Sequence, residues 1–113
     1  MSDKTIFEKI IDRTVPAEIL LENEYAIVIK DINPQAPIHV LIIPKHRILR
    51  ISEVKESESS IISNLFLTAA QFAKENNISD FRLVINNGAQ AGETVPHLHI
   101  HLLSGRPMGW PPG

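Results

Sequence analysis

Histidines alternate with aliphatic residues along the second half of the segment TVPHLHIHLL, residues 94–103. Side chains of a β-strand point to alternate faces, so residues two apart share a face. His97, His99 and His101 therefore fall on one face, and the leucine and isoleucine residues between them fall on the other. This pattern predicts a strand with one buried face and one face, lined by imidazoles, that is open to solvent.

Helical spacing of apolar residues occurs in two places. Thr5 and Glu8 have the spacing of a capping box, and the apolar residues behind them recur at helical intervals until Pro16 stops the pattern. A broad apolar stripe between Ser59 and Asn76 has the same period over a much longer stretch. We therefore expect one short helix near the start of the chain and one long helix in its middle.

The remaining apolar segments predict strands. AEILLENEYAIVIKD, residues 17–31, contains two apolar runs around a polar turn and is typical of a hairpin, and IHVLIIP, residues 38–44, places His39 in a further strand. FRLVINNG, residues 81–88, reads as a strand that ends in a turn. The order helix, three strands, helix, two strands, with hairpin-length connections, predicts an α+β fold with an antiparallel sheet. The last segment, residues 104–113, is expected to be a tail without regular structure.

Composition narrows the possible functions. A chain of 113 residues is expected to form a single domain over residues 1–113. Its 11 basic and 13 acidic residues provide no field that would hold a nucleic acid or an anionic membrane. The lack of cysteine excludes disulfides, thiolate nucleophiles and cysteine-based zinc sites. No segment resembles a signal peptide or a membrane span, so we expect a soluble protein with a cytoplasmic location.

Three imidazoles on one strand face indicate chemistry, because neighbouring imidazoles oppose each other's protonation and add no packing. One interpretation is nucleophilic and acid–base catalysis at phosphorus, for which neutral imidazole is suited. The other is a metal site. His97 and His101 would lie roughly 13 Å apart on an extended strand, so one zinc ion could not bind all three histidines. Such a site would need a ligand from elsewhere, with His39 or Glu93 as candidates.

The run HLHIHLL, residues 97–103, resembles the motif of the histidine triad (HIT) superfamily. The segments IFEKII, VPAEI, DINPQAP, HVLIIPK, VINNG and GRPMGWPPG extend this resemblance from about residue 5 to the end, and they are similar to the Hint branch, the histidine triad nucleotide-binding proteins. The resemblance implies a homodimer in which the two sheets join into one. It also implies hydrolysis of purine nucleoside 5′-phosphoramidates, conjugates of AMP or GMP with an amine, without a metal or other cofactor.

The same resemblance implies roles for individual residues. His99 would attack the α-phosphorus to give a nucleotidyl-histidine, His101 would contact the phosphate and leaving group, and His97 would orient the nucleophile with help from His39. Asn86 and Thr94 would bind phosphate oxygens or the leaving group, and Asp31 would bind the ribose hydroxyls. The other residues implied to form the nucleotide site are Phe7, Ile10, Ile29, Ile32, Leu41, Gly92, Glu93 and Val95. Trp110, in the tail, would cross to the partner protomer and take part in substrate selection.

Three positions depart from the family pattern. Glu93 stands where glutamine is usual, Thr94 replaces a frequent serine, and Arg47 occupies a position where histidine is common. Glu93 could repel an anionic phosphate or accept a proton, which leaves open a second hypothesis, a nucleotide-binding or protein-interaction module with vestigial catalysis. We assign no role to Arg47, and we expect His46 to be an ordinary surface residue.

Overall fold

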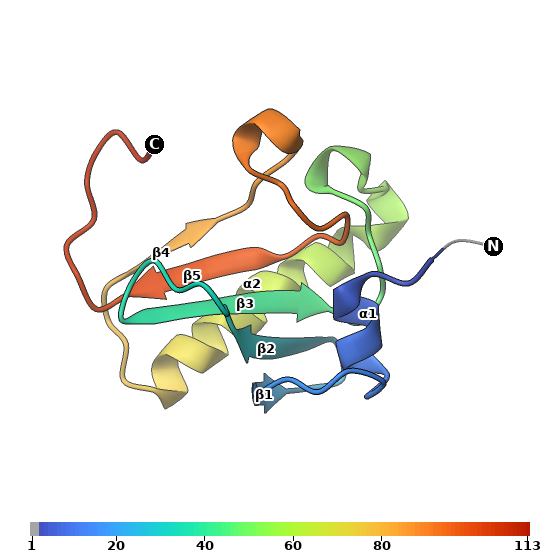
Figure 1. The fold of residues 1–113 in the computed structure, drawn as a ribbon, viewed down its shortest axis with the longest axis horizontal. Helices are drawn as coiled ribbons and strands as arrows, with labels where there is room; N and C mark the ends of the chain where they lie inside the picture. Colours follow the sequence, from blue (N-terminus) through green and yellow to red (C-terminus); the bar gives the residue numbers. More distant parts are fainter. Residues whose placement is uncertain (1–2) are drawn as a thin grey trace.

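The computed structural model describes residues 3–113 and has a five-stranded antiparallel sheet as its centre (Figure 1). The helices are α1 (Ile6–Ile11) and α2 (Ser59–Glu75), and the strands are β1 (Ile19–Glu22), β2 (Ala26–Lys30), β3 (Ile38–Pro44), β4 (Phe81–Val84) and β5 (Ile100–Ser104). Three short 3-10 turns, η1 (Ile51–Glu53), η2 (Glu56–Glu58) and η3 (Ala89–Ala91), lie in the loops. The expected order of elements and the α+β class are confirmed.

The strands lie in the order β1-β2-β3-β5-β4, so β5 pairs with both β3 and β4. In the β3–β5 register Leu41 lies opposite His101, and His39 lies opposite Leu103. His39 and His101 are therefore diagonal neighbours on one face of the sheet. The two strands that carry histidines lie side by side although they are far apart in the sequence.

One face of the sheet is covered by α2, which crosses behind the strands in Figure 1. The strand residues that point to this face alternate along β2, β3 and β5 and pack with one side of α2, as the sequence periods predict. The buried members of this cluster are Ala26, Val28, Val40, Ile42, Ile48, Leu65, Ala69, Phe72, Leu98, Ile100 and Leu102. The buried cluster on this face is apolar, whereas His39 and His101 point to the opposite face together with Leu41.

The opposite face is covered only in part, by the short helix α1. Phe7 and Ile10 of α1 pack with Ile27, Ile29, Leu41 and Ile43 of the sheet. The capping box of Thr5 and Glu8 is present, as expected. Because α1 has only 6 residues, the rest of this sheet face is left for the histidines.

The histidine segment corrects one prediction. The strand begins at Ile100, so His97 and His99 lie in irregular backbone before it, and His97 is fully buried rather than open to solvent. Two prolines explain why the backbone pairing between β3 and β5 does not extend to His97 and His99. Pro44, the last residue of β3, and Pro96, just before the triad, have no N–H to donate to a neighbouring strand. The amide of Leu98 donates to the Ile48 carbonyl at 2.7 Å instead.

The tail leaves the sheet through a position that requires glycine. Ser104 still belongs to β5, and residues 105–113 form no helix or strand. Gly105 has a φ of 95°, and a Cβ atom there would lie 2.9 Å from Cβ of Pro37. Strand β4 is also shorter than expected and ends at Val84. Among residues 3–113, no helix combines the length and apolar character needed to span a membrane.

Candidate active site

Four imidazoles form one continuous group on the partly covered face of the sheet. The ring centroids of His39 and His101 are 5.2 Å apart, and those of His101 and His99 are 5.0 Å apart. Phe7 of α1 joins His97 to this row, since its ring meets His97 and His99 edge-on at 5.7 and 5.0 Å. The structure thus brings together the three histidines of the motif and the fourth from β3.

The hydrogen bond made by one nitrogen of each ring sets where the hydrogen of a neutral imidazole lies, because a carbonyl can only accept and an amide N–H can only donate. Nδ1 of His99 lies 2.7 Å from the backbone carbonyl of His97. This nitrogen must therefore carry the hydrogen, and Nε2 of His99 keeps a lone pair. The nitrogen with the lone pair is the one that could attack an electrophile.

His97 is fixed at both nitrogens. Nε2 donates to the carbonyl of Pro44 at 3.0 Å, and Nδ1 lies 3.0 Å from the hydroxyl of Thr5, which can donate to it. The ring of His97 is therefore fully used in holding the chain, and it is its carbonyl that orients His99. We expected His39 to help His97, but the structure places His39 against His101 instead.

A chain of hydrogen bonds links the backbone to His101. The amide of Gln35 donates to Nδ1 of His39 at 3.0 Å, so the hydrogen of neutral His39 lies on Nε2. Nε2 of His39 then donates to Nδ1 of His101 at 2.9 Å. Neutral His101 consequently carries its hydrogen on Nε2, which makes that nitrogen a donor. The two neighbouring rings thus differ in what Nε2 can do. Nε2 of His99 has a lone pair, and Nε2 of His101 has an N–H that can donate a hydrogen bond.

Burial favours the neutral form of the motif histidines. Removal from water lowers the pKa of His97 and of His99 from the ordinary value, against smaller opposing effects of backbone carbonyls and carboxylates. Burial, together with the neighbouring His99 and His39, lowers the pKa of His101 to about 4. These three imidazoles therefore remain uncharged near neutral pH.

A small recess beside His99 is lined by several of the residues expected to form the nucleotide site. Asn86, Glu93, Val95 and His97 line it together with His99. Gly92, which has a φ of 101°, lies close enough to Asn86 that a Cβ atom would meet its amide nitrogen at 3.4 Å. Asn86, Glu93 and Val95 thus lie beside His99.

The residues expected around the base and ribose lie in three places. Phe7, Ile10, Ile29 and Leu41 belong to the α1-side cluster, with Val95 packed against it. Asp31 lies at the other end of the histidine row, 3.4 Å from Nε2 of His39 and 3.9 Å from Nδ1 of His101. Ile32 is fully exposed and does not join the apolar cluster.

Two expected residues lie apart from the histidines. Thr94 is exposed and lines a surface hollow with Thr5 and Arg47. Trp110 is 84% exposed on the tail. Neither residue is brought to the histidine row within residues 3–113. His46 is on the surface, where Nε2 lies 3.1 Å from a carboxylate oxygen of Glu58.

One group of three side chains within residues 3–113 has the donors and spacing to hold a metal ion, namely Asp31, His39 and His101. Sequence reasoning named His39 as a possible ligand but did not find Asp31. A metal on Nε2 of His39 would require the hydrogen to be on Nδ1, yet Nδ1 accepts from the Gln35 amide. The donor types fit a metal, but this hydrogen bond favours His39 as a hydrogen-bond donor to His101.

Sequence reasoning missed three contributors to the site. Thr5 was identified only as a helix cap, although its hydroxyl also meets His97. Gln35 acts through its backbone, which no residue type can reveal. Arg50 pairs with Glu93, and the unusual carboxylate beside three histidines was the one signal that a cation must be near.

Comparison with protein families gives a match over most of the chain. A model of the HIT domain matches residues 12–108. An uncharacterized HIT-like protein of Synechocystis is 49% identical over 114 residues, which cover 100% of both chains. Adenylylsulfatase HINT1 of Arabidopsis thaliana is 41% identical over 112 residues, which cover 96% of this chain and 76% of the relative.

Solved structures have the same fold. The crystal structure of a HIT family hydrolase from Legionella pneumophila superposes with a TM-score of 0.93 at 39% identity and covers 97% of this chain and 100% of its own. A HIT family hydrolase from Clostridium thermocellum superposes with a TM-score of 0.90 at 45% identity, and 96% of each chain is covered.

The neutral histidines generate a prediction about acid stability. A histidine whose pKa is lowered in the folded state stays neutral there, whereas the unfolded chain binds the proton below about pH 6.5. The free energy of unfolding should therefore be constant above pH 7 and fall as the pH drops from 6.5 toward 4. Each of the three histidines can contribute up to about 1.4 kcal/mol per pH unit in this range.

Urea unfolding at pH 7, 6 and 5 measures this dependence. His101→Gln should flatten it, because the pKa of His101 is lowered to about 4 in the folded protein. His46→Gln is the matched control, because it removes a histidine that lies outside the row with its side chain 62% exposed, and the loss of stability between pH 7 and pH 5 should persist in it. An unfolding free energy equal at pH 7 and pH 5 would contradict the neutral-imidazole description.

Proposed function

The chain belongs to the HIT domain family, and from this premise we propose that it is a purine nucleoside 5′-phosphoramidate hydrolase that works through a nucleotidyl-histidine intermediate. The observation that carries the proposal is the bond from Nδ1 of His99 to the His97 carbonyl. That bond leaves the lone pair of Nε2 for attack, next to the N–H of His101. A nucleophile and a donor side by side are what displacement at phosphorus needs.

In the first step, Nε2 of His99 forms a bond to the α-phosphorus while the bond from phosphorus to the amine breaks. The imidazole becomes positively charged, and the His97 carbonyl at 2.7 Å stabilises this charge through the N–H of Nδ1. The N–H of His101 is the donor for the departing nitrogen or a phosphate oxygen. The departing nitrogen takes up a proton from solvent while the hydrogen bond from His101 stabilises the negative charge that develops on it.

In the second step, water attacks the phosphorus and breaks its bond to His99. This attack releases one proton, which balances the proton taken up by the amine, so that one water molecule is consumed and both histidines return to their starting state. Asn86 in the recess beside His99 has a side-chain amide that could bind a phosphate oxygen. Asp31, at the opposite end of the row, has the acceptor oxygens that ribose hydroxyls would need.

The name of the Arabidopsis relative, adenylylsulfatase, points to a second leaving group, sulfate, for the same adenylyl transfer. The two substrates differ in what the site must provide. A departing amine needs a proton, whereas sulfate leaves as a stable anion. The role of His101 therefore distinguishes them.

We also propose that the chain functions as a homodimer to which the tail contributes. Strand β4 lies at an edge of the sheet, paired only with β5 among the strands of residues 3–113, and it exposes 40% of Phe81. In monomeric proteins, the unpaired edge strands of a sheet are usually protected from pairing with a strand of another chain. Trp110 is 84% exposed, which is an unusual state for the largest apolar side chain. A second copy would cover both features.

We predict that His99→Ala lowers turnover of adenosine 5′-phosphoramidate by about 10³-fold or more, because the variant lacks the nucleophile. Release of amine measures turnover, and calorimetry should find AMP binding little changed. His46→Ala, outside the site, is the control and should retain activity. Mass spectrometry after an alkaline denaturing quench, which preserves the P–N bond, should locate an AMP adduct on the peptide with His99, and an active His99→Ala would refute the assigned nucleophile.

We predict that His101→Ala harms phosphoramidate turnover more than turnover of adenosine 5′-phosphosulfate, by about tenfold or more. The reason is that the departing amine nitrogen needs a hydrogen-bond donor such as the N–H of His101, whereas sulfate leaves as a stable anion. Measurement of kcat/KM for both substrates with wild type and variant gives the comparison. Equal losses on the two substrates would show that His101 does not assist the leaving group.

We predict a dimer in solution, with twice the chain mass by light scattering. Trp110, the one tryptophan of the chain, provides a direct probe. Its emission should shift to the red on dilution through the dissociation range, because the indole then becomes exposed to water. Trp110→Ala should weaken dimers or change substrate preference, and a monomer at high concentration would overturn this part of the proposal.

A further inference from the structure

The carboxylate of Glu93 is held by three hydrogen bonds. Nε and Nη2 of Arg50 donate to its two oxygens at 2.9 and 3.0 Å, and the amide of Gly88 donates to Oε1 at 2.8 Å. Only 9% of the Glu93 side chain is exposed. Two parallel bonds between a guanidinium and a carboxylate form the most directional ion pair that side chains make.

This pair lies next to the proposed nucleophile. Arg50 and Glu93 line the same small recess as His99 and Asn86. The bond from Arg50 is the main reason that the pKa of Glu93 falls to about 2. Glu93 is therefore an anion near neutral pH, close to the place where an anionic phosphate would bind.

The ionisable groups that act on His99 are Glu93, Asp31, His97 and His101. Arg50 is the cation on Glu93, and it also pairs with Glu53. Without Arg50, the charge of Glu93 would face His99 and the phosphate uncompensated. That charge would favour protonated His99, which cannot attack, and would repel the substrate.

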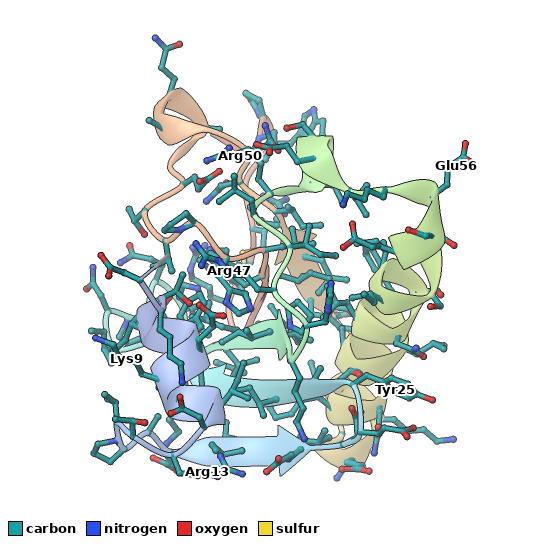
Figure 2. The ribbon with its side chains drawn as sticks, turned by 90° about the vertical axis from the view of Figure 1, so that its right-hand side faces the viewer. Lys9, Arg13, Tyr25, Arg47, Arg50 and Glu56 are labelled. Carbon is teal, nitrogen blue, oxygen red and sulfur yellow. The ribbon has the colours of Figure 1, made fainter. Side chains whose placement is uncertain are left out.

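The pair also connects two loops. Arg50 follows β3, and Glu93 lies in the loop before β5, which passes through η3. Figure 2 shows Arg50 between these two segments at the upper end of the sheet. The amide of Ser52 adds a second connection by donating to the Asn87 side chain at 2.9 Å. The loop that carries Asn86 and Gly92 to His99 is thus anchored by Arg50.

We propose that Arg50 is a positioning residue of the site. Its guanidinium holds the Glu93 carboxylate, and with it the loop 88–93, in place beside His99. It also cancels the negative charge of Glu93, which would otherwise oppose both attack by His99 and binding of the phosphate. The inference rests on the proposed function for its catalytic consequence, but the pairing acts on His99 whether or not the chain is a hydrolase. Glu93 is on this basis one half of a neutral pair rather than a handicap.

The two single substitutions should shift His99 in opposite directions. Arg50→Gln leaves the Glu93 charge uncompensated and should raise the pKa of His99. Glu93→Gln leaves the guanidinium without its carboxylate and should lower it. The double variant Arg50→Gln/Glu93→Gln places two amides opposite each other and should return the pKa close to that of the wild type. A residue that only supports the fold would not produce this cancellation.

NMR titration of the histidine Cε1–H signals in the full chain measures these shifts, with the His99 signal assigned by its loss in His99→Gln. Arg13→Gln is the matched control, because it breaks the exposed ion pair with Glu22 and should leave His99 unchanged. Equal titration of His99 in all four proteins would overturn the proposal. If Arg50→Gln does not fold, the downward shift in Glu93→Gln and its reversal in the double variant decide the same question.

Kinetics with adenosine 5′-phosphoramidate test the catalytic consequence. Arg50→Gln should raise KM by about tenfold and move the acid limb of the pH profile to higher pH, and the double variant should recover to within about threefold. A double variant no better than Arg50→Gln would refute compensation. If the wild type itself does not turn over the substrate, the proposed hydrolase fails, while the NMR titration still decides the pairing.

Discussion

Hydrogen bonds between backbone groups and imidazole rings are the constraint on which the site depends. The carbonyls of His97 and Pro44 and the amide of Gln35 each meet one ring nitrogen. Because these groups can act only as acceptor or only as donor, they determine the tautomer of each neutral ring. The chemistry of the row follows from the path of the main chain, and side chains such as Thr5 complete it.

The two unequal faces of the sheet make this arrangement possible. The face against α2 is filled by aliphatic residues, and it provides the buried core. The opposite face is shared between six-residue α1 and the imidazoles. A longer helix there would bury the histidines without access for a ligand. A shorter one would leave His97 exposed to water, and its pKa would return toward the ordinary value.

Much of this could be derived from the sequence, and the limits have physical causes. Alternation and helical spacing identified all seven helices and strands, because burial on one face imposes a period that can be read directly. The exact start of β5 could not be derived from the sequence, because it depends on Pro44 in β3, which has no N–H to donate to β5. Contacts between distant segments, such as Arg50 with Glu93, depend on loop paths that no local period encodes. The tautomers were inaccessible for the same reason, because their partners are main-chain atoms that every residue possesses.

Helix α1 lies before the segment that matches the HIT domain, which spans residues 12–108. Yet Thr5 contacts His97, and Phe7 packs against both His97 and His99. A gene trimmed to the boundaries of the conserved domain would thus encode a sheet whose triad has lost its hydroxyl donor and its aromatic cover. For expression and for domain grafting, the structural unit that holds the histidines begins upstream of the segment that matches the family model.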